Sequence, residues 1–186
     1  IDPTSPYAMN AAWAAGRKMD AVIVAALAGN AYAGVAGATT VALPSAQKVA
    51  AASAGLTIAK LRSAREILLG ADVDLDMGAT CIINPAGLTD LLSATEITSS
   101  DYNTVKALVQ GQVDTFLGFK FVVSTQVTAL KAYCYAKNAA VLAVGSEPVV
   151  RISERADKNY STQVFVEMDI GATRVEDEGV VEISYV

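Results

Sequence analysis

Three aspartates at alternating positions are the first candidate for chemistry in this chain. Asp72, Asp74 and Asp76 have the spacing with which a calcium-binding loop begins. Such a loop needs a glycine at its sixth position and a bidentate glutamate at its twelfth. Here Gly78 comes one position late, and Ile83 stands where the glutamate is required. The pattern therefore favours a solvated strand edge over a metal site.

Other motifs that carry chemistry are also incomplete. The acidic run 176–178 precedes Gly179 and indicates a turn, and nothing marks its carboxylates as a glycosidase pair. Gly29, Gly34 and Gly37 follow a predicted helix and lack the dinucleotide-binding spacing. No serine lies in a G-x-S-x-G motif, and histidine is absent, which excludes His-dependent triads and His metal sites. We assign no catalytic, cofactor-binding or metal-binding residue and expect no cofactor.

The two cysteines, Cys81 and Cys134, each lie in an apolar, strand-like run. Free cysteine is among the most buried residue types, and disulfides are rare in reducing compartments. Two buried free thiols are therefore favoured, with a disulfide as the alternative.

Composition favours a protein that buries surface against neighbours. Hydrophobic residues make up 53% of the chain and the mean hydropathy is +0.38. The net charge is −5 and no basic cluster is present, which argues against sequence-specific nucleic-acid binding. The longest apolar run, Ala21–Ala28, is shorter than the ~20 residues that cross a bilayer, so we expect no membrane partner.

Helices dominate the first half of the expected structure. The first spans Pro6–Ala28, between a Ser5 cap and a Gly29 stop. Apolar residues at helical spacing give it one stripe, formed by Ala12, Ala15, Met19, Val22 and Ala26. A second helix runs from a Thr57 cap to Gly70. Its buried face consists of Ile58, Leu61, Ala64, Ile67 and Leu68, and its charged residues, Lys60, Arg62, Arg65 and Glu66, are expected mostly outside.

Weaker helix signals occur between and after these segments. We expect a short Ala-rich helix from Ser45 to Ala54 and another helix after Asn84-Pro85 that buries its leucines. Ser93–Asn103 is polar and loop-like, and a short helix is expected at Tyr102–Val109. The wider segment Ser93–Leu117 is expected to form a mobile loop.

Strands dominate the second half, which favours an α+β protein over a parallel α/β one. The expected strands are Thr80–Ile83, Phe119–Ser124, Lys131–Lys137, Val149–Arg155, Thr162–Asp169 and Val180–Val186. We expect the last three to pair with each other and to pack on the first helix, because its stripe has no other long apolar partner. The expected contacts are Val149, Ile152, Val164, Val166, Val181 and Ile183.

Several stretches, in order, resemble tailed-phage major capsid (coat) proteins. They are Ala15–Asp20, Gly55–Leu61 with Asp72–Asp74, Cys81–Pro85 with its following leucines, Ser100–Tyr102 with Gly118–Ser124, and Ala132–Ala143. Each stretch alone is weak, and the order of the strand-Asn-Pro-helix and Gly-Phe-strand-Ser elements makes the combination more specific. The family fold is the Hong-Kong-ninety-seven-type capsid fold, with a spine helix, peripheral strands and a central axial domain.

The resemblance implies a structural protein, not an enzyme, that self-assembles into the icosahedral head enclosing phage DNA. Residues 1–54 and 147–186 would form the peripheral domain, and residues 55–146 the axial domain. Its partners would be identical subunits in pentamers and hexamers, scaffold and portal proteins, and packaged DNA contacted only non-specifically. The protein would be made in the bacterial host cytoplasm and would reside in the virion capsid.

The sequence leaves alternatives open for the function, for cross-linking between subunits and for assembly. An encapsulin-like compartment shell shares the fold, an enzyme of unknown chemistry is the alternative from another class, and the low aromatic content disfavours a ligand-binding module. Lys120, Lys131 and Lys137 are candidates for an inter-subunit Lys–Asn cross-link, but no extended loop that would carry the reacting lysine is evident. The N-terminal arm that normally precedes the spine helix is also not evident. We therefore expect this chain to fold but to assemble poorly.

Overall fold

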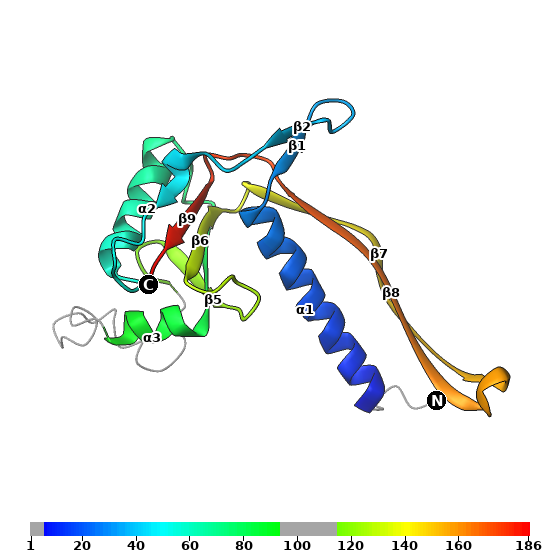
Figure 1. Cartoon of the computed structure of the whole chain (residues 1–186). Coiled ribbons are helices and arrows are strands. Elements are labelled where there is room, and N and C mark those ends of the chain that lie inside the picture. The colour runs from blue at the N-terminus through cyan, green and yellow to red at the C-terminus, as the bar shows by residue number, and fades with distance from the viewer. Residues whose placement is uncertain (1–5, 94–114) are drawn as a thin grey trace.

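The computed structural model describes residues 6–93 and 115–186 as a body and an arm. The body contains a five-stranded sheet with helices α2 and α3. The arm consists of helix α1 and a long ribbon of two strands, β7 and β8, and Figure 1 shows the ribbon reaching away from the body. This mixture of segregated helices and sheets is the α+β class expected from the sequence.

The central sheet has the strand order β3-β9-β6-β4-β5. Its strands are β3 (Lys48–Val49), β4 (Ala79–Ile83), β5 (Phe119–Val123), β6 (Lys131–Ala136) and β9 (Val180–Ser184). Strands β6 and β9 are antiparallel to each other, as are β4 and β6, whereas β5 runs parallel to β4 and β3 parallel to β9. Fully buried Cys81, Ile83 and Phe119 lie in the core cluster that this sheet shares with α2.

Helix α2 (Ile58–Gly70) follows the expected pattern except at Lys60. The Thr57 side chain caps the helix by accepting from the Lys60 backbone N–H, and Leu61, Ala64 and Leu68 are buried as expected. The expectation that Lys60 points outward is wrong, because its side chain is 7% exposed. Its Nζ donates to four backbone carbonyls, those of Ala51 (2.7 Å), Ala54 (2.6 Å), Gly55 (3.0 Å) and Ser184 (3.2 Å). Burial lowers the pKa of Lys60.

Helix α3 (Pro85–Ser93) begins where the Asn-Pro signal placed it. The Asn84 side chain accepts from the Gly87 N–H at 2.8 Å and from the Tyr185 hydroxyl at 2.6 Å. A Cβ at Gly87 would lie 2.9 Å from that hydroxyl, so the position needs glycine for close packing.

The segment between α1 and α2 contains no Ala-rich helix, so that expectation is wrong. It forms a hairpin of β1 (Ala31–Ala33) and β2 (Thr39–Val41), followed by a single 3-10 turn, η1 (Ser45–Gln47). Ala52 and Ser53 have φ values of 47° and 50°, in the left-handed region. A run of residues in that region cannot continue a right-handed helix.

In the arm, the first helix has the expected bounds, and two strands are longer than expected. Helix α1 spans Pro6–Ala28 without a break at Gly16. Strands β7 (Ala140–Arg155) and β8 (Ser161–Arg174) pair antiparallel along almost their whole length, with irregularities between Val144 and Val149. A short 3-10 turn, η3 (Ala156–Lys158), connects them.

The expected placement of the last strand is wrong. Strand β9 does not join the ribbon but lies between β3 and β6 in the body, where Val181 and Ile183 are fully buried. The strand is buried on both faces, as a central strand with a nearly continuous apolar run requires. Only Val180 reaches the cluster that contains Val24 and Leu27 of α1.

Two expectations lie outside the described residues. These are the helix at Tyr102–Val109 and most of the mobile loop at Ser93–Leu117. Among the described helices, none combines the length and the apolar character that a membrane-crossing segment requires.

Replacing Ile183 by alanine should lower the free energy of unfolding by about 2–5 kcal/mol, because the side chain is fully buried in the sheet. Met19→Ala should cost less, since Met19 is only half-buried, and Asp74→Ala should change little, since Asp74 is exposed. Urea unfolding of the three variants measures these differences. An Ile183→Ala chain as stable as the parent would show that β9 is misplaced.

Tyr133 should make the stability fall at high pH. Burial, and next the negative charge of Glu182, raise the pKa of Tyr133 from 10.0 to about 12. The stabilisation is fully present below pH 10 and is lost as the pH rises toward 12, by roughly 2–3 kcal/mol in all. Urea unfolding across this range should show the loss in the parent chain and a smaller one in Tyr133→Phe. Parallel pH profiles would contradict the assignment.

Candidate functional site

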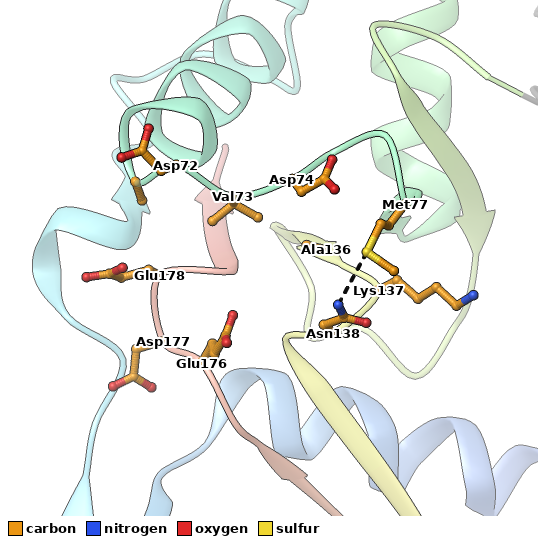
Figure 2. Close-up of a pocket in the computed structure, with 11 residues that line it drawn as sticks. Asp72, Val73, Asp74, Met77, Ala136, Lys137, Asn138, Glu176, Asp177 and Glu178 are labelled. Carbon is orange, nitrogen blue, oxygen red and sulfur yellow. Dashed lines mark hydrogen bonds between the residues drawn. The ribbon is translucent and has the colours of Figure 1, made fainter.

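A cavity of about 640 Å³ lies at the junction of the body and the arm. Asp72, Asp74 and the acidic run 176–178 line it, but Figure 2 shows their carboxylates spread around its rim rather than converging. Asp74 accepts from the Asp76 backbone N–H at 2.9 Å, and Asp177 is paired with Arg174. The described residues contain no group of three or more His, Cys, Asp or Glu side chains placed to hold a metal ion. The arrangement does not indicate a reaction.

The glycines and lysines that the sequence offered as candidates lie in turns, in an ion pair or on the surface. Gly34 and Gly37 form the turn of the β1–β2 hairpin with φ values of 90° and 62°, a role in which glycine avoids strain. Lys131 pairs with Glu182 at 3.0 Å, while Lys120 and Lys137 are exposed. The structure does not bring these lysines together with the acidic clusters into one site.

The arm has an inner face, on which helix and ribbon meet. On β8 the half-buried positions alternate with exposed ones, so that Met168, Ile170 and Ala172 lie on one side. Helix α1 contacts both strands of the ribbon. Of its predicted stripe, Ala15 is buried, Met19, Val22 and Ala26 are half-buried, and Ala12 is exposed. The expected packing of the ribbon on α1 is therefore confirmed, but Ala12, the last strand and Val149 were wrongly expected to take part, since Val149 lies across from Glu167 on the opposite face of the ribbon.

A second face of α1 is buried at one end and exposed at the other. Val24 and Leu27 are buried against the body. Three helical turns earlier, the same side of the helix carries Trp13 and Gly16. Trp13 is 59% exposed, and a Cβ at Gly16 would meet nothing within 4 Å. This side of the helix, on which Asp20 is also exposed, thus continues beyond the body without a partner among the described residues.

The ribbon also has an outer face, opposite the one on α1. Phe165 and Val149 are 44% and 42% exposed there, and Glu167 and Asp169 are exposed beside them. Arg151 lies directly across from Phe165, and Val149 across from Glu167. Two-stranded ribbons are marginally stable alone in water, so an outer face with exposed apolar groups indicates a further contact.

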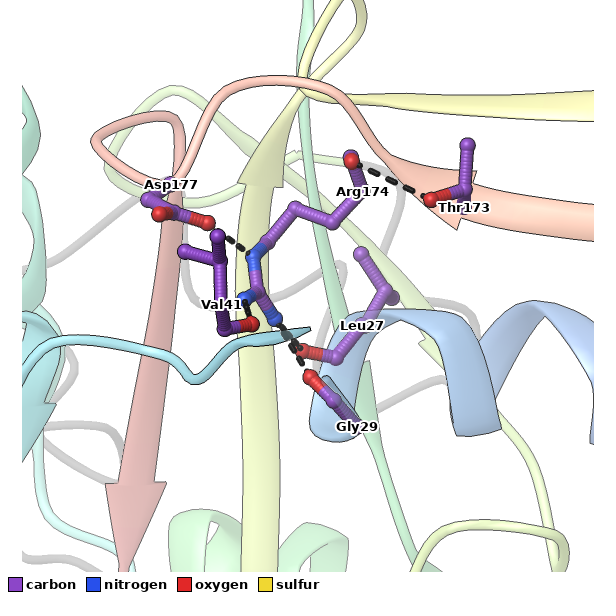
Figure 3. A network of polar contacts seen from close by, with 6 residues as sticks. All are labelled: Leu27, Gly29, Val41, Thr173, Arg174 and Asp177. Carbon is purple, nitrogen blue, oxygen red and sulfur yellow. Dashed lines mark hydrogen bonds and ion pairs between the residues drawn. The ribbon is translucent and has the colours of Figure 1, made fainter. Parts of the chain in front are cut away.

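Arg174 joins the arm to the body, and sequence reasoning did not single it out. Figure 3 shows its fully buried guanidinium between the end of α1, strand β2 and the turn before β9. Nη1 donates to the carbonyls of Gly29 (2.7 Å) and Leu27 (3.3 Å), and Nη2 to that of Val41 (3.1 Å). Nε pairs with Asp177. The cation therefore satisfies helix-terminal carbonyls that have no partner within the helix.

Comparison with known proteins gives one family and several related folds. The family model described as phage capsid protein matches residues 1–186. A search of curated proteins gave no match. The structure of Mycobacterium phage Che8 aligns with a TM-score of 0.74 at 19% identity, covering 97% of this chain and 62% of that one. The capsid structure of cyanophage P-SCSP1u aligns with a TM-score of 0.68 at 15% identity. The alignment covers 100% of this chain and 67% of that one.

A weaker similarity extends to an encapsulin. The SrpI encapsulin of Synechococcus elongatus PCC 7942 aligns with a TM-score of 0.52 at 11% identity, covering 77% of this chain and 56% of that one. These alignments confirm the expected Hong-Kong-ninety-seven-type fold. The chain spans about 62% of the length of the Che8 protein.

Arg174→Met should detach the arm from the body. The change leaves Asp177 and three backbone carbonyls without their donor, and breaking a buried ion pair costs about 3–5 kcal/mol. Arg174→Lys should not rescue the loss, because one ammonium cannot reach acceptors in all these directions. The matched control is Arg155→Met, which breaks an exposed pair with Asp157 and should not change unfolding measurably. Equal effects of the two methionine variants would contradict this role for Arg174.

Proposed function

Because this chain belongs to the phage capsid protein family, we propose that it is the shell-forming part of a major capsid protein, whose activity is assembly. The observation that carries the proposal is the match of the family model to residues 1–186. The fold agrees, since the capsid structure of cyanophage P-SCSP1u aligns over the whole chain. In this proposal identical copies build the icosahedral head of the virion around phage DNA, in pentamers and hexamers, and the chain has no enzymatic activity.

The finer features of the whole protein follow as part of this proposal. Scaffold and portal proteins would be its assembly partners, DNA would be touched only non-specifically, and synthesis would occur in the host cytoplasm. Residues 1–54 and 147–186 would be peripheral and residues 55–146 axial. The arm of α1, β7 and β8 supports this division, whereas the place of Val180–Ser184 in the central sheet argues for moving that strand to the axial part.

An encapsulin-like compartment is the second candidate, because an encapsulin shares the fold at a lower TM-score. The two functions differ in what the shell encloses. Terminase and portal genes beside the gene for this chain would favour the phage head, and a neighbouring cargo-enzyme gene would favour the compartment.

We further propose that the outer face of α1 binds the outer face of the ribbon in a second copy. The first surface is defined by Met9, Trp13, Gly16 and Arg17, the second by Val149, Phe165, Glu167 and Asp169. Arg17 on the helix surface is opposite in charge to Glu167 and Asp169 on the ribbon, and all three side chains are exposed, whereas the nearby Asp20 and Arg151 carry the reverse charges. Gly16 supports a contact here, since a mid-helix glycine costs about 1 kcal/mol relative to alanine and no described residue fills the space beside it.

The spacing of the two surfaces is also matched. Trp13 and Arg17 are one helical turn apart, a rise of about 6 Å. Phe165 and Glu167 are two strand positions apart, a rise of about 6.6 Å. The aromatic side chains can therefore meet while the arginine meets the glutamate. A contact between two different surfaces is head-to-tail, and it closes into rings when the rotation permits.

Charge reversal tests this interface. Arg17→Glu and Glu167→Arg should each weaken self-association about tenfold, and the double variant should restore it, because the pair is reversed rather than lost. Gly16→Gln should raise the thermal stability of the subunit and still reduce association. Sedimentation velocity over a range of concentrations measures association, and thermal unfolding measures stability.

The control is Arg62→Glu, an exposed position on α2, which should associate like the parent. Arg17→Glu and Gly16→Gln variants that also associate like the parent would contradict this interface and leave the shell-forming role intact. A parent chain that stays monomeric at every concentration would count against both this interface and the shell-forming role. Efficient formation of complete shells by the parent, seen by size exclusion with light scattering, would contradict the expectation that this chain assembles poorly.

A further inference from the structure

We propose that Cys81 and Cys134 are a modification site at which an oxidising environment forms a disulfide within the subunit. The two residues lie directly opposite each other on the neighbouring antiparallel strands β4 and β6. Their sulfur atoms are 3.0 Å apart, and both side chains are fully buried. The structure contains them as free thiols.

The backbone geometry already suits the bond. Directly opposite residues in an antiparallel pair have Cα atoms about 4.5–5.5 Å apart. Disulfides join Cα atoms that are about 4.4–6.8 Å apart. Bonding therefore requires a small movement of the two sulfur atoms and no rearrangement of the strands.

The reaction needs an oxidant, and a small disulfide such as oxidised glutathione supplies it. One cysteine thiolate attacks the oxidant and forms a mixed disulfide, releasing one glutathione thiolate. The second cysteine thiolate then attacks the protein sulfur and releases the other. In sum, two cysteine thiols lose two protons and two electrons, and the oxidant is reduced to two thiols.

Burial determines when this exchange occurs. The hydrogen bond with Cys134 and the loss of solvent raise the pKa of Cys81, so its reactive thiolate is scarce in the closed sheet. Exchange therefore proceeds during folding or local opening, and a bond once formed is shielded from reductants. A shell that moved from a reducing to an oxidising environment would gain a cross-link between positions 53 residues apart.

The test is to unfold the chain in urea and refold it with either oxidised or reduced glutathione. The oxidised sample should lose the mass of two hydrogens, show no alkylatable thiol when denatured, and melt about 10 °C higher than the reduced sample. Starting from the unfolded chain removes burial as an obstacle to the oxidant. Cys81→Ala and Cys134→Ala should each melt at the same temperature after either treatment.

Two outcomes would overturn the proposal. One is a chain that refolds with two alkylatable thiols at every ratio of oxidised to reduced glutathione. The other is a disulfide-containing chain that melts at or below the temperature of the reduced one. Neither outcome depends on assembly, so the result is independent of the proposed shell function.

Discussion

A two-stranded ribbon cannot bury its own apolar face, and this constraint shapes the arm of the molecule. Strands β7 and β8 reach away from the body, so the residues on their inner face need another element to exclude water. Helix α1 supplies that cover with a narrow stripe of small side chains, because alanine lets the helix lie close to the strands. The helix can do so only while its end is held, and the buried Arg174 holds it against both the ribbon and the body.

Local patterns in the sequence predicted most of the elements. The periodic stripe of α1, the Thr57 cap of α2 and the Asn-Pro start of α3 are signals carried by neighbouring residues, and each element begins where its signal lies. The two buried cations were not predicted, because they are satisfied by carbonyls distant in the chain. The acceptors of Lys60 include Ser184, and those of Arg174 include Val41. A usable signal did exist for Arg174, which continues the inward alternation of Met168, Ile170 and Ala172.

The candidate site was less predictable than the fold. Helical spacing alone does not show whether Trp13 is exposed, because it lies on the same side of the helix as the buried Val24 and Leu27, with the exposed Asp20 between them. How far the body extends along α1 decides which residues on this side of the helix are buried and which are exposed. The register that sets Cys81 against Cys134 is likewise a property of strand pairing, which the two separate apolar runs do not specify. The enzyme alternative required convergent polar groups, and the cavity that carries the acidic residues spreads them apart.

The position of β9 has a consequence for the order of folding. This strand separates β3 from β6 and supplies Val181 and Ile183 to the core, yet it follows the whole ribbon in the chain. Its pairing with β3 joins Val49 to Ile183, a contact of very long sequence separation. Such contacts slow folding, because the intervening chain must be ordered before they form. The body therefore cannot close until the ribbon has been synthesised, and a nascent chain arrested within β8 would expose the unpaired edges of β3 and β6 to aggregation.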